Sequence, residues 1–210
     1  MIYWIRPSGL LQRLKGMMNK FEIRTQELIT LLPEFLSLNN QEIFNISKVI
    51  VNSLVHNKKV LICGNGGSAA DAQHLAAEFV NAFSRDIERK ALPAISLATD
   101  TSVITSISND FGYDRIFSRQ VEALGNAGDV LISFSTSGES KNCIEAIKTA
   151  SELGLISIAF TKVGSELAKI SNYSICVPSS NTQHIQECHI IAYHCLIEVI
   201  EDSLFRSKND

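Results

Sequence analysis

The sequence lacks the features that mark membrane-spanning and secreted proteins. No apolar run reaches the roughly 18 residues that a membrane-spanning helix needs. No apolar segment near the N-terminus is long enough for the core of a signal peptide. The five cysteines are odd in number and form no CxxC pair, so they do not suggest a disulfide framework. We therefore expect a cytoplasmic protein whose cysteines are reduced, buried thiols.

An excess of positive charge is also absent. The 19 Lys and Arg residues stand against 22 Asp and Glu, which gives a formal net charge of -3. Because proteins that bind nucleic acid or anionic membranes are usually basic, we expect neither partner. The hydrophobic content of 45% and the charged content of 20% are ordinary for a globular protein. A chain of 210 residues is long enough for one domain with a sizeable core.

Acidic residues are missing from the N-terminal segment, residues 1–20, which contains several basic ones. We expect this segment to be an arm or extension, and residues 21–210 to form the folded domain. Apolar residues recur at helical spacing over residues 21–36 and 41–56, which predicts two amphipathic helices. Pro33 is expected to kink or interrupt the first of them.

The most informative stretch begins with a short apolar run at residues 60–63, which is typical of a buried strand. Three glycines then fall within residues 64–67, and Ser68 is placed to cap a helix over residues 69–83. Glycines leave the backbone amides of such a turn unobstructed. The amides and the positive end of the helix dipole together predict a site for an anionic group such as phosphate.

A second unit repeats this plan further along the chain. Residues 129–134 form an apolar run, residues 135–140 read Ser-Thr-Ser-Gly-Glu-Ser, and a helix is predicted over residues 141–153. The hydroxyls and amides of this turn could surround the oxygens of a phosphate. The alternative is a cluster of caps that serves only the helix. Two such turns in one alternating chain favour the phosphate site, because ligands collect at the carboxyl ends of parallel strands.

The remaining segments continue the alternation of strands and helices. Strands are predicted at 93–97, 155–160 and 174–177, and helices from the cap at 99–102 to about 108, at 117–124, at 165–170 and at 182–205, with Thr182 as cap and a break at 109–112. This order predicts an α/β fold with a doubly wound, mainly parallel five-stranded sheet flanked by helices, and with helices at its N-terminus.

Two ionisable side chains share a face of the first predicted α/β helix. His74 and Glu78 stand four residues apart, so they are neighbours on one face. An imidazole and a carboxylate beside an anion site can hold a divalent metal or move protons. The alternative is a pair of ordinary surface residues, since such pairs are common in helices. The glycine turn next to them favours the functional interpretation.

The last predicted helix carries polar groups on a largely apolar surface. Gln186 and His194 lie about two turns apart along the helix, and their directions around the helix axis differ by about 80°. Polar groups in such a setting need partners. The histidine could also be a core or interface residue. His184 and Cys188 form a rival pair for zinc on a different face, which we rank below the first set.

Several ordered motifs together resemble one known family. They are Cys63-Gly-Asn-Gly-Gly-Ser68, Asp71-Ala-x-His74-x3-Glu78, Asn109-Asp-Phe-Gly112, Ser135-Thr-Ser-Gly-x-Ser140 and Ile185-Gln-Glu-x-His189. The set resembles the sugar isomerase (SIS) domain family, and within it the phosphoheptose isomerases, from about residue 22 to residue 205. The resemblance implies an SIS-type sandwich. It also implies a homotetramer whose active sites lie between subunits.

The resemblance also implies an activity and a set of site residues. Sedoheptulose 7-phosphate would be isomerised through an enediol(ate) to D-glycero-D-manno-heptose 7-phosphate, the first step of ADP-heptose and lipopolysaccharide core heptose synthesis. The substrate-binding residues would be Asn65, Gly66, Gly67, Ser68, Glu78, Asn109, Asp110, Ser135, Thr136, Ser137, Ser140 and Gln186. One zinc ion per subunit would be held by His74, Glu78, Gln186 and His194. Glu78 is the candidate base and His194 the candidate acid and base at the sugar oxygens.

Two departures from the family pattern concern the sugar contacts. Asn81-Ala82 stands where Gly-Arg is common, and Arg85 in the following loop is a candidate replacement for that arginine. His184 stands where an arginine usually precedes the Ile-Gln-Glu motif. Both positions bear on which sugar fits.

Two other functions compete with the isomerase. The first is a non-catalytic SIS protein that senses a phosphosugar or associates with a replication initiator. Such relatives tend to lose the acid–base pair, whereas Glu78 and His194 are both present here. The second is a dinucleotide-binding oxidoreductase, because Gly64-x-Gly66-x-x-Ala69 fits a relaxed fingerprint. Against it, Asp100 lies well beyond the roughly 20-residue spacing expected of a ribose-binding acid.

Overall fold

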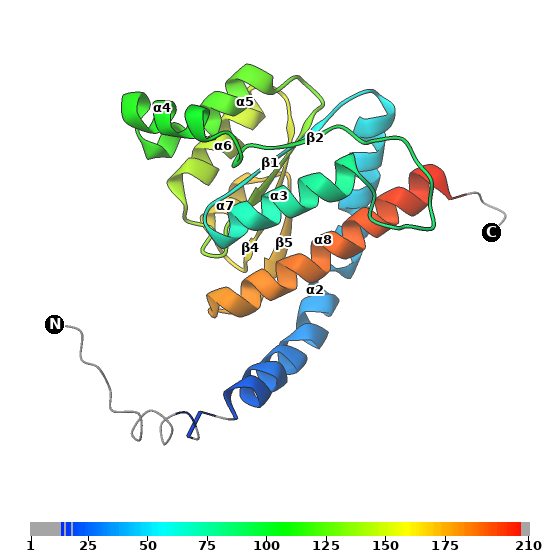
Figure 1. Ribbon diagram of the computed structural model, residues 1–210, viewed down its shortest axis with the longest axis vertical. Helices are drawn as coiled ribbons and strands as arrows, with labels where there is room; N and C mark the ends of the chain where they lie inside the picture. The colour runs from blue at the N-terminus through cyan, green and yellow to red at the C-terminus, as the bar shows by residue number, and fades with distance from the viewer. Residues whose placement is uncertain (1–13, 15, 18, 207–210) are drawn as a thin grey trace.

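A parallel sheet between two layers of helices forms the centre of the molecule (Figure 1). The computed structural model describes residues 14, 16–17 and 19–206. Most of the expected N-terminal arm therefore lies outside the described residues. The strands are β1 Val60–Gly64, β2 Ala94–Ser96, β3 Val130–Phe134, β4 Ile156–Lys162 and β5 Tyr173–Val177. The helices are α2 Lys20–Val55, α3 Gly67–Val80, α4 Thr101–Phe111, η1 Tyr113–Arg115, α5 Ser118–Leu124, α6 Lys141–Glu152, α7 Glu166–Ile170 and α8 Thr182–Phe205.

The five strands run in the order β2-β1-β3-β4-β5, and every neighbouring pair is parallel. All residues of β1 and β3 are buried, which explains why their sequences are continuously apolar rather than alternating. The predicted α/β class, the five strands and their parallel arrangement are confirmed. The strand bounds differ from the predicted ones by only one or two residues.

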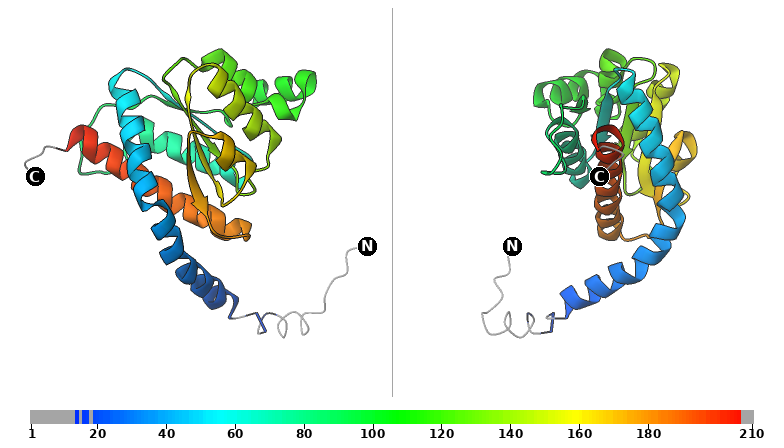
Figure 2. Two further views of the ribbon diagram at one scale, coloured as in Figure 1. Left: turned by 180° about the vertical axis from the view of Figure 1, so that it is seen from behind. Right: turned by 90° about the vertical axis from the view of Figure 1, so that its right-hand side faces the viewer.

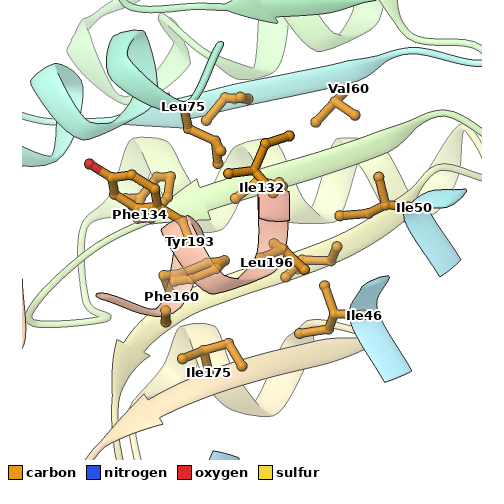
Figure 3. Close-up of a cluster of buried hydrophobic side chains, with 14 of the residues drawn as sticks. Ile46, Ile50, Val60, Leu75, Ile132, Phe134, Phe160, Ile175, Tyr193 and Leu196 are labelled. Atoms are coloured by element: carbon orange, nitrogen blue, oxygen red, sulfur yellow. The ribbon is translucent and has the colours of Figure 1, made fainter. Parts of the chain in front are cut away.

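The three central strands β1, β3 and β4 send alternate side chains into two separate cores. Val60 and Ile62 face the helices α2, α3 and α8, where they pack with residues such as Leu75 and Leu196 (Figure 3). Leu61 and other side chains on the opposite face of the sheet pack against α5, α6 and α7 in the second core. Because both faces of the sheet are covered, the site can lie only at its edges or ends.

The strand order places two loops side by side at the carboxyl ends of β1 and β3. From β1 the chain passes to β2 on one side, while the later strands extend on the other side. Gly64, the last residue of β1, is in register with Phe134, the last residue of β3. The glycine turn and the serine-rich turn follow these two residues, so they flank the point where the strand order reverses. Ligands of open α/β sheets bind at this position.

The prediction of two N-terminal helices is wrong, because residues 20–55 form one helix with Pro33 inside it. A proline in a helix interior removes one hydrogen bond and costs roughly 3 kcal/mol. The helix nevertheless continues across the proline, with a visible bend along its length (Figure 2). Asn39 anchors it beyond that point, since its side chain donates to the carbonyl of Cys176 at 2.9 Å and accepts from the amide of Cys176 at 2.8 Å. This contact also closes the exposed edge of β5.

Two predicted caps are also corrected. Ser68 lies inside the first turn of α3, while Gly66 with φ of 57° holds the N-cap position without a side-chain hydrogen bond. Asn181 rather than Thr182 caps α8, because its side chain accepts from the amides of Gln183 and His184. Ser68 and Thr182 are of residue types that often cap helices and lie within two positions of the true caps, so they gave a misleading signal.

Two predicted helix ends are shifted. Helix α3 ends at Val80 rather than at residue 83, because the amides of Phe83 and Ser84 turn toward the carboxylate of Glu201. Helix α4 continues through Phe111 and ends at Gly112, whose φ of 88° favours glycine. The predicted break at residues 109–112 therefore falls one turn too early.

No helix in the described ranges is both long and apolar enough to cross a membrane. None of the five cysteines is paired in a disulfide in this part of the chain. Cys63, Cys143 and Cys188 are buried, as expected, whereas Cys176 is partly exposed and Cys195 is exposed. The prediction of buried thiols therefore holds for three of the five.

Candidate active site

The two loops at the carboxyl ends of β1 and β3 are joined by a pair of amide side chains. Asn65 donates to the side chain of Asn142 at 2.8 Å and accepts from it at 2.8 Å. The hydroxyl of Tyr113 also donates to Asn65 Oδ1, at 2.9 Å. These contacts use the side chain of Asn65 to fix one loop against the other. They leave Gly66 and Gly67 exposed on the surface of the turn.

The serine-rich loop is organised by its own hydroxyls. Ser135 Oγ accepts from the amide of Gly138 at 3.0 Å and donates to Ser140 Oγ at 3.1 Å. Gly138 has φ of 68°, and an added Cβ there would lie 2.3 Å from the Cβ of Ser165, so only glycine fits this turn. Ser137 is exposed at the tip, where its Oγ accepts from the amide of Glu139. The loop therefore presents hydroxyls at the N-terminus of α6, where an anion is favoured.

Helices α3 and α8 lie side by side and run in the same direction (Figure 1). Asp71 accepts from Gln186 at 2.9 Å near their N-terminal ends. Further along, the Tyr193 hydroxyl lies 2.9 Å from His74 Nδ1. This parallel packing brings together polar side chains that are more than a hundred residues apart in the sequence.

His74 lies at the centre of a chain of hydrogen bonds. Its Nε2 is 3.0 Å from Glu78 Oε1, and its Nδ1 is 2.9 Å from the hydroxyl of Tyr193. Burial raises the pKa of Tyr193, and the carboxylates of Asp71 and Glu78 raise it further, so the phenol stays protonated and donates to Nδ1. In a neutral ring the Nε2 hydrogen then points to Glu78 and holds its carboxylate in place.

His194 lies beside His74, which is itself hydrogen-bonded to Glu78. The rings of His194 and His74 have centroids 5.1 Å apart and meet edge to face. Burial lowers the pKa of His194, the neighbouring His74 lowers it further, and Glu78 opposes the shift. His194 is therefore neutral near pH 7, the form that can accept a proton.

The predicted metal ligands agree with zinc in donor type. Two imidazoles and a carboxylate gather where α3 and α8 meet, and all three are groups that zinc accepts. The fourth predicted ligand, Gln186, lies against Gly67 and donates to Asp71. Across the described ranges, three or more His, Cys, Asp or Glu side chains do not converge as a metal cluster. Among the four, His74 and Glu78 are hydrogen-bonded to each other, and His194 contacts the His74 ring edge to face.

Two of the predicted sugar contacts lie apart from this cluster. Asn109 and Asp110 are exposed in the last turn of α4, where the Asn109 side chain donates to Asp110 Oδ1 at 2.8 Å. No hydrogen bond joins them to either loop in the described residues. Tyr113, in the short helix that follows, makes that link through Asn65 instead.

The structure shows what surrounds the two positions that depart from the family pattern. Arg85 is exposed, whereas Arg89 is buried against the C-terminal end of α3. His184 bridges α2 and α8, because its Nε2 lies 2.9 Å from Glu27 and its Nδ1 lies 2.7 Å from Glu187. The hydrogen bonds that His184 donates to Glu27 and Glu187 raise its pKa and favour its charged form. His184 therefore serves the contact between two helices and does not pair with Cys188.

His189, the last residue of the Ile-Gln-Glu-x-His motif, belongs to the core. Its ring packs near Phe134 and Phe160, with centroids 5.9 and 5.8 Å away. Burial lowers its pKa to about 4, so the ring is neutral. The lone-histidine alternative considered for this helix thus applies to His189 and not to His194.

Several contributing residues gave no recognisable signal in the sequence. Asn142, Tyr113 and Tyr193 act through contacts with residues far away in the chain, and each looks ordinary in its own segment. Asp71 belongs to one of the family motifs, but its contact with Gln186 was not expected. Asp100, the acid weighed against a dinucleotide fingerprint, caps α4 by accepting from the amide of Val103.

Comparisons with known proteins agree on one relationship. A family model described as "SIS domain" matches residues 25–162. A phosphoheptose isomerase from Aquifex aeolicus is 50% identical over 169 residues, covering 80% of this chain and 87% of that protein. One from Thermodesulfovibrio yellowstonii is 49% identical over 181 residues, covering 86% of this chain and 89% of that protein. The structure of a phosphoheptose isomerase from Neisseria gonorrhoeae matches with a TM-score of 0.83 at 38% identity, over 89% of this chain and 99% of that one.

Proposed function

The chain belongs to the SIS domain family and, within it, to the phosphoheptose isomerases, and we propose that it converts sedoheptulose 7-phosphate to D-glycero-D-manno-heptose 7-phosphate. The gathering of Glu78, His74 and His194 where α3 and α8 pack together carries this assignment, because the reaction needs a base at carbon and a proton carrier at oxygen. A non-catalytic relative would have no use for this arrangement.

The proton transfers follow from the two side chains. Glu78 removes a proton from C1 of the ketose, which leaves an enediol(ate), and returns a proton to C2 to give the aldose. His194, neutral near pH 7, takes the proton of the C1 hydroxyl and gives one to the C2 oxygen. The hydrogen bond from His74 holds the Glu78 carboxylate in position. Each such transfer by a positioned group contributes typically about 10²- to 10⁴-fold.

We propose that the loop of Ser135, Thr136, Ser137 and Ser140 binds the phosphate. The exposed Ser137 at the tip and the position of these hydroxyls at the start of α6 support this, because an anion is favoured at the N-terminus of a helix. Asn65, Gly66 and Gly67 lie next to this loop at the reversal of strand order and are placed to contact the sugar.

We propose zinc as the cofactor, held by His74, Glu78, His194 and Gln186. The donor types support this, with the amide oxygen of Gln186 as the weakest ligand. When bound, the ion would polarise the substrate carbonyl and make the neighbouring C–H more acidic. Ligation would compete with the use of Glu78 as base, so metal content and turnover must be measured together.

We propose that the active form is a homo-oligomer, and specifically a tetramer. Glu78 lies about 16 Å along the α3 axis from the glycine turn, at 1.5 Å per residue. This exceeds the reach of one seven-carbon sugar phosphate, so a second copy is expected to supply one half of each site. Large apolar side chains are exposed along α2, among them Ile29 at 54% and Leu36 at 63%. They line a groove of about 520 Å³ between α2 and α8 that a partner could cover.

We also propose that the enzyme acts in the cytoplasm, at the start of ADP-heptose synthesis for lipopolysaccharide core. Unpaired thiols support a reducing compartment.

The assignment is tested by assaying the full chain with sedoheptulose 7-phosphate in D₂O. We expect an aldose product that carries deuterium at C2, because the enediol(ate) exchanges its proton with solvent. A chelator should lower the rate, and added zinc should restore it. Tight binding of the sugar phosphate without turnover would contradict the proposal and favour a non-catalytic sensor.

A further inference from the structure

Arg89 and Glu201 form an ion pair that is shielded from solvent at the C-terminal end of α3. Their side chains are 0% and 1% exposed, and Arg89 Nε donates to Glu201 Oε1 at 2.5 Å. Arg89 comes from the loop after α3, and Glu201 comes from α8. The pair therefore joins the two helices that carry Glu78 and His194 (Figure 1).

Two further hydrogen bonds of Arg89 reach the backbone of the catalytic helix, besides one to the carbonyl of its neighbour Lys90. Its Nη2 donates to the carbonyl of Glu78 at 2.6 Å, and its Nη1 donates to the carbonyl of Phe79 at 2.9 Å. Carbonyls in the last turn of a helix have no partner within the helix, and a cation there is favoured by the helix dipole. Arg89 thus fixes the peptide group of Glu78 itself.

Glu201 is held equally firmly on the other side. Its carboxylate accepts from the amides of Phe83 and Ser84 at 2.8 and 2.9 Å, in addition to Arg89. Glu201 lies about two turns after His194 on α8, so the two side chains point from nearly the same side of that helix. The contacts therefore connect the backbone of Glu78 to the helix face of His194.

Stability alone does not account for such a pair. Desolvating two charges costs several kcal/mol per ion, and replacing a buried pair by apolar residues of similar size is often neutral or stabilising. What the planar guanidinium adds is direction, because it binds two carbonyls and a carboxylate at fixed angles. A lysine could not satisfy all three acceptors in this way.

We infer that Arg89 and Glu201 are positioning residues, which hold the carboxylate of Glu78 at the correct place relative to the imidazole of His194. This inference rests on the proposed isomerase function. A displacement of about 1 Å of a catalytic group can cost up to about 100-fold in rate, whereas substrate binding through the distant phosphate loop is unaffected.

The test uses the double substitution R89M/E201M and the single substitution R89K. The double variant leaves no unpaired buried charge and is expected to fold, which circular dichroism checks. We expect its kcat to fall by at least about tenfold while KM stays within about twofold, because only positioning is lost. The kcat of R89K should lie between that of the wild type and that of the double variant. A folded double variant with wild-type kcat would overturn the inference.

A matched control separates positioning from general destabilisation. Asp129 is also buried in an ion pair, with Lys59, but at the amino end of β3 and away from α3 and α8. We expect D129N to lower the melting temperature without changing kcat. If D129N lowers kcat as much as R89M/E201M at equal loss of stability, the effect is structural and the inference is wrong.

Hydrogen–deuterium exchange gives a readout that does not depend on turnover. In R89M/E201M the amides of residues 78–81 should exchange at least about tenfold faster than in the wild type, since the end of α3 loses its partners. Amides of residues 70–73 should keep their rates. A wild-type protein without turnover would contradict the proposed function. Unchanged exchange of residues 78–81 in R89M/E201M would contradict the positioning role, whatever the turnover.

Discussion

The two ends of the same parallel sheet differ in how their polar groups are used. At the amino ends of β1 and β3, Asp129 is 2% exposed and accepts from the amides of Lys59 and Asn126 and from the Lys59 ammonium. At the carboxyl ends, Gly66, Gly67 and Ser137 are exposed. The amino end is closed by a buried carboxylate with three hydrogen bonds, whereas the carboxyl end presents two exposed turns to a ligand.

This difference separates stability from function within one set of strands. Substitutions at the closed amino end should lower the free energy of unfolding and leave turnover unchanged. Substitutions of exposed residues at the carboxyl end, and of Glu78 and His194 on α3 and α8, should lower turnover and leave stability nearly unchanged. A substitution at the carboxyl end that lowered stability but not turnover, or one at the amino end that lowered turnover but not stability, would contradict this separation.

The largest effect is expected for Glu78→Gln. The amide has almost the shape of the carboxylate but cannot accept the proton from C1, so turnover should fall by about 10²- to 10⁴-fold. The melting temperature and the affinity for inorganic phosphate should stay as in the wild type. Steady-state kinetics and calorimetry measure these quantities, with Glu198→Gln on the exposed face of α8 as the matched control. Retained turnover would remove Glu78 from the role of base.

A smaller loss is expected for His194→Ala. Removing the proton carrier at the oxygens should lower kcat by about 100-fold, and zinc content after reconstitution should fall because one proposed ligand is gone. Metal analysis by mass spectrometry measures the second effect. His56→Ala, on an exposed histidine at the end of α2, is the control for loss of an imidazole. Unchanged zinc content would end the ligand role and leave the proton-transfer role intact.

Asp129→Asn tests the closed end. Removing the charge leaves Lys59 and the Asn126 amide with a poorer acceptor, so the free energy of unfolding should drop by about 1–3 kcal/mol. Burial would raise the pKa of Asp129, but the Lys59 and Asn126 hydrogen bonds outweigh it and lower the pKa. The carboxylate therefore stabilises the fold above its unfolded pKa of about 3.9 and loses this effect as pH falls through the folded value.

Urea titrations at pH 7 and at pH 2–3 check this sign. The difference between D129N and the wild type should be present at pH 7 and shrink at the lower pH, as the wild-type carboxyl begins to take up a proton. A difference that grows on acidification, or a loss of kcat at pH 7, would contradict the separation of the two ends.

The sequence predicted the features at the carboxyl ends of β1 and β3 better than those at their amino ends. The glycine turn and the serine-rich turn each follow a buried strand and precede a helix, so local pattern alone located them. The resemblance supplied Glu78 and His194, and the structure brings them together. Asp129 and Arg89 gave no such signal, because their partners lie 70 and 112 residues away.

Helix continuity was also beyond the reach of local patterns. Pro33 is a strong local signal for a helix end, yet tertiary contacts such as Asn39 with β5 keep α2 whole. Likewise the end of α3 is set by Glu201 from α8, which no pattern near residue 80 reveals. Long-range contacts therefore set the boundaries at Pro33 and at the end of α3, whereas local residues such as Gly112 set the end of α4.

The smallest effect is expected for Gly67→Ala, at the first residue of α3. An added Cβ would lie 2.6 Å from both Oε1 and Nε2 of Gln186, so the end of this flexible side chain must move. Its hydrogen bond to Asp71 should break, while the helix itself tolerates alanine well. We expect KM for sedoheptulose 7-phosphate to rise by about tenfold, which is about 1.4 kcal/mol, with an unchanged melting temperature. A fall in melting temperature without a change in KM would show that Gly67 serves packing, and would place a stability determinant at the end assigned here to binding.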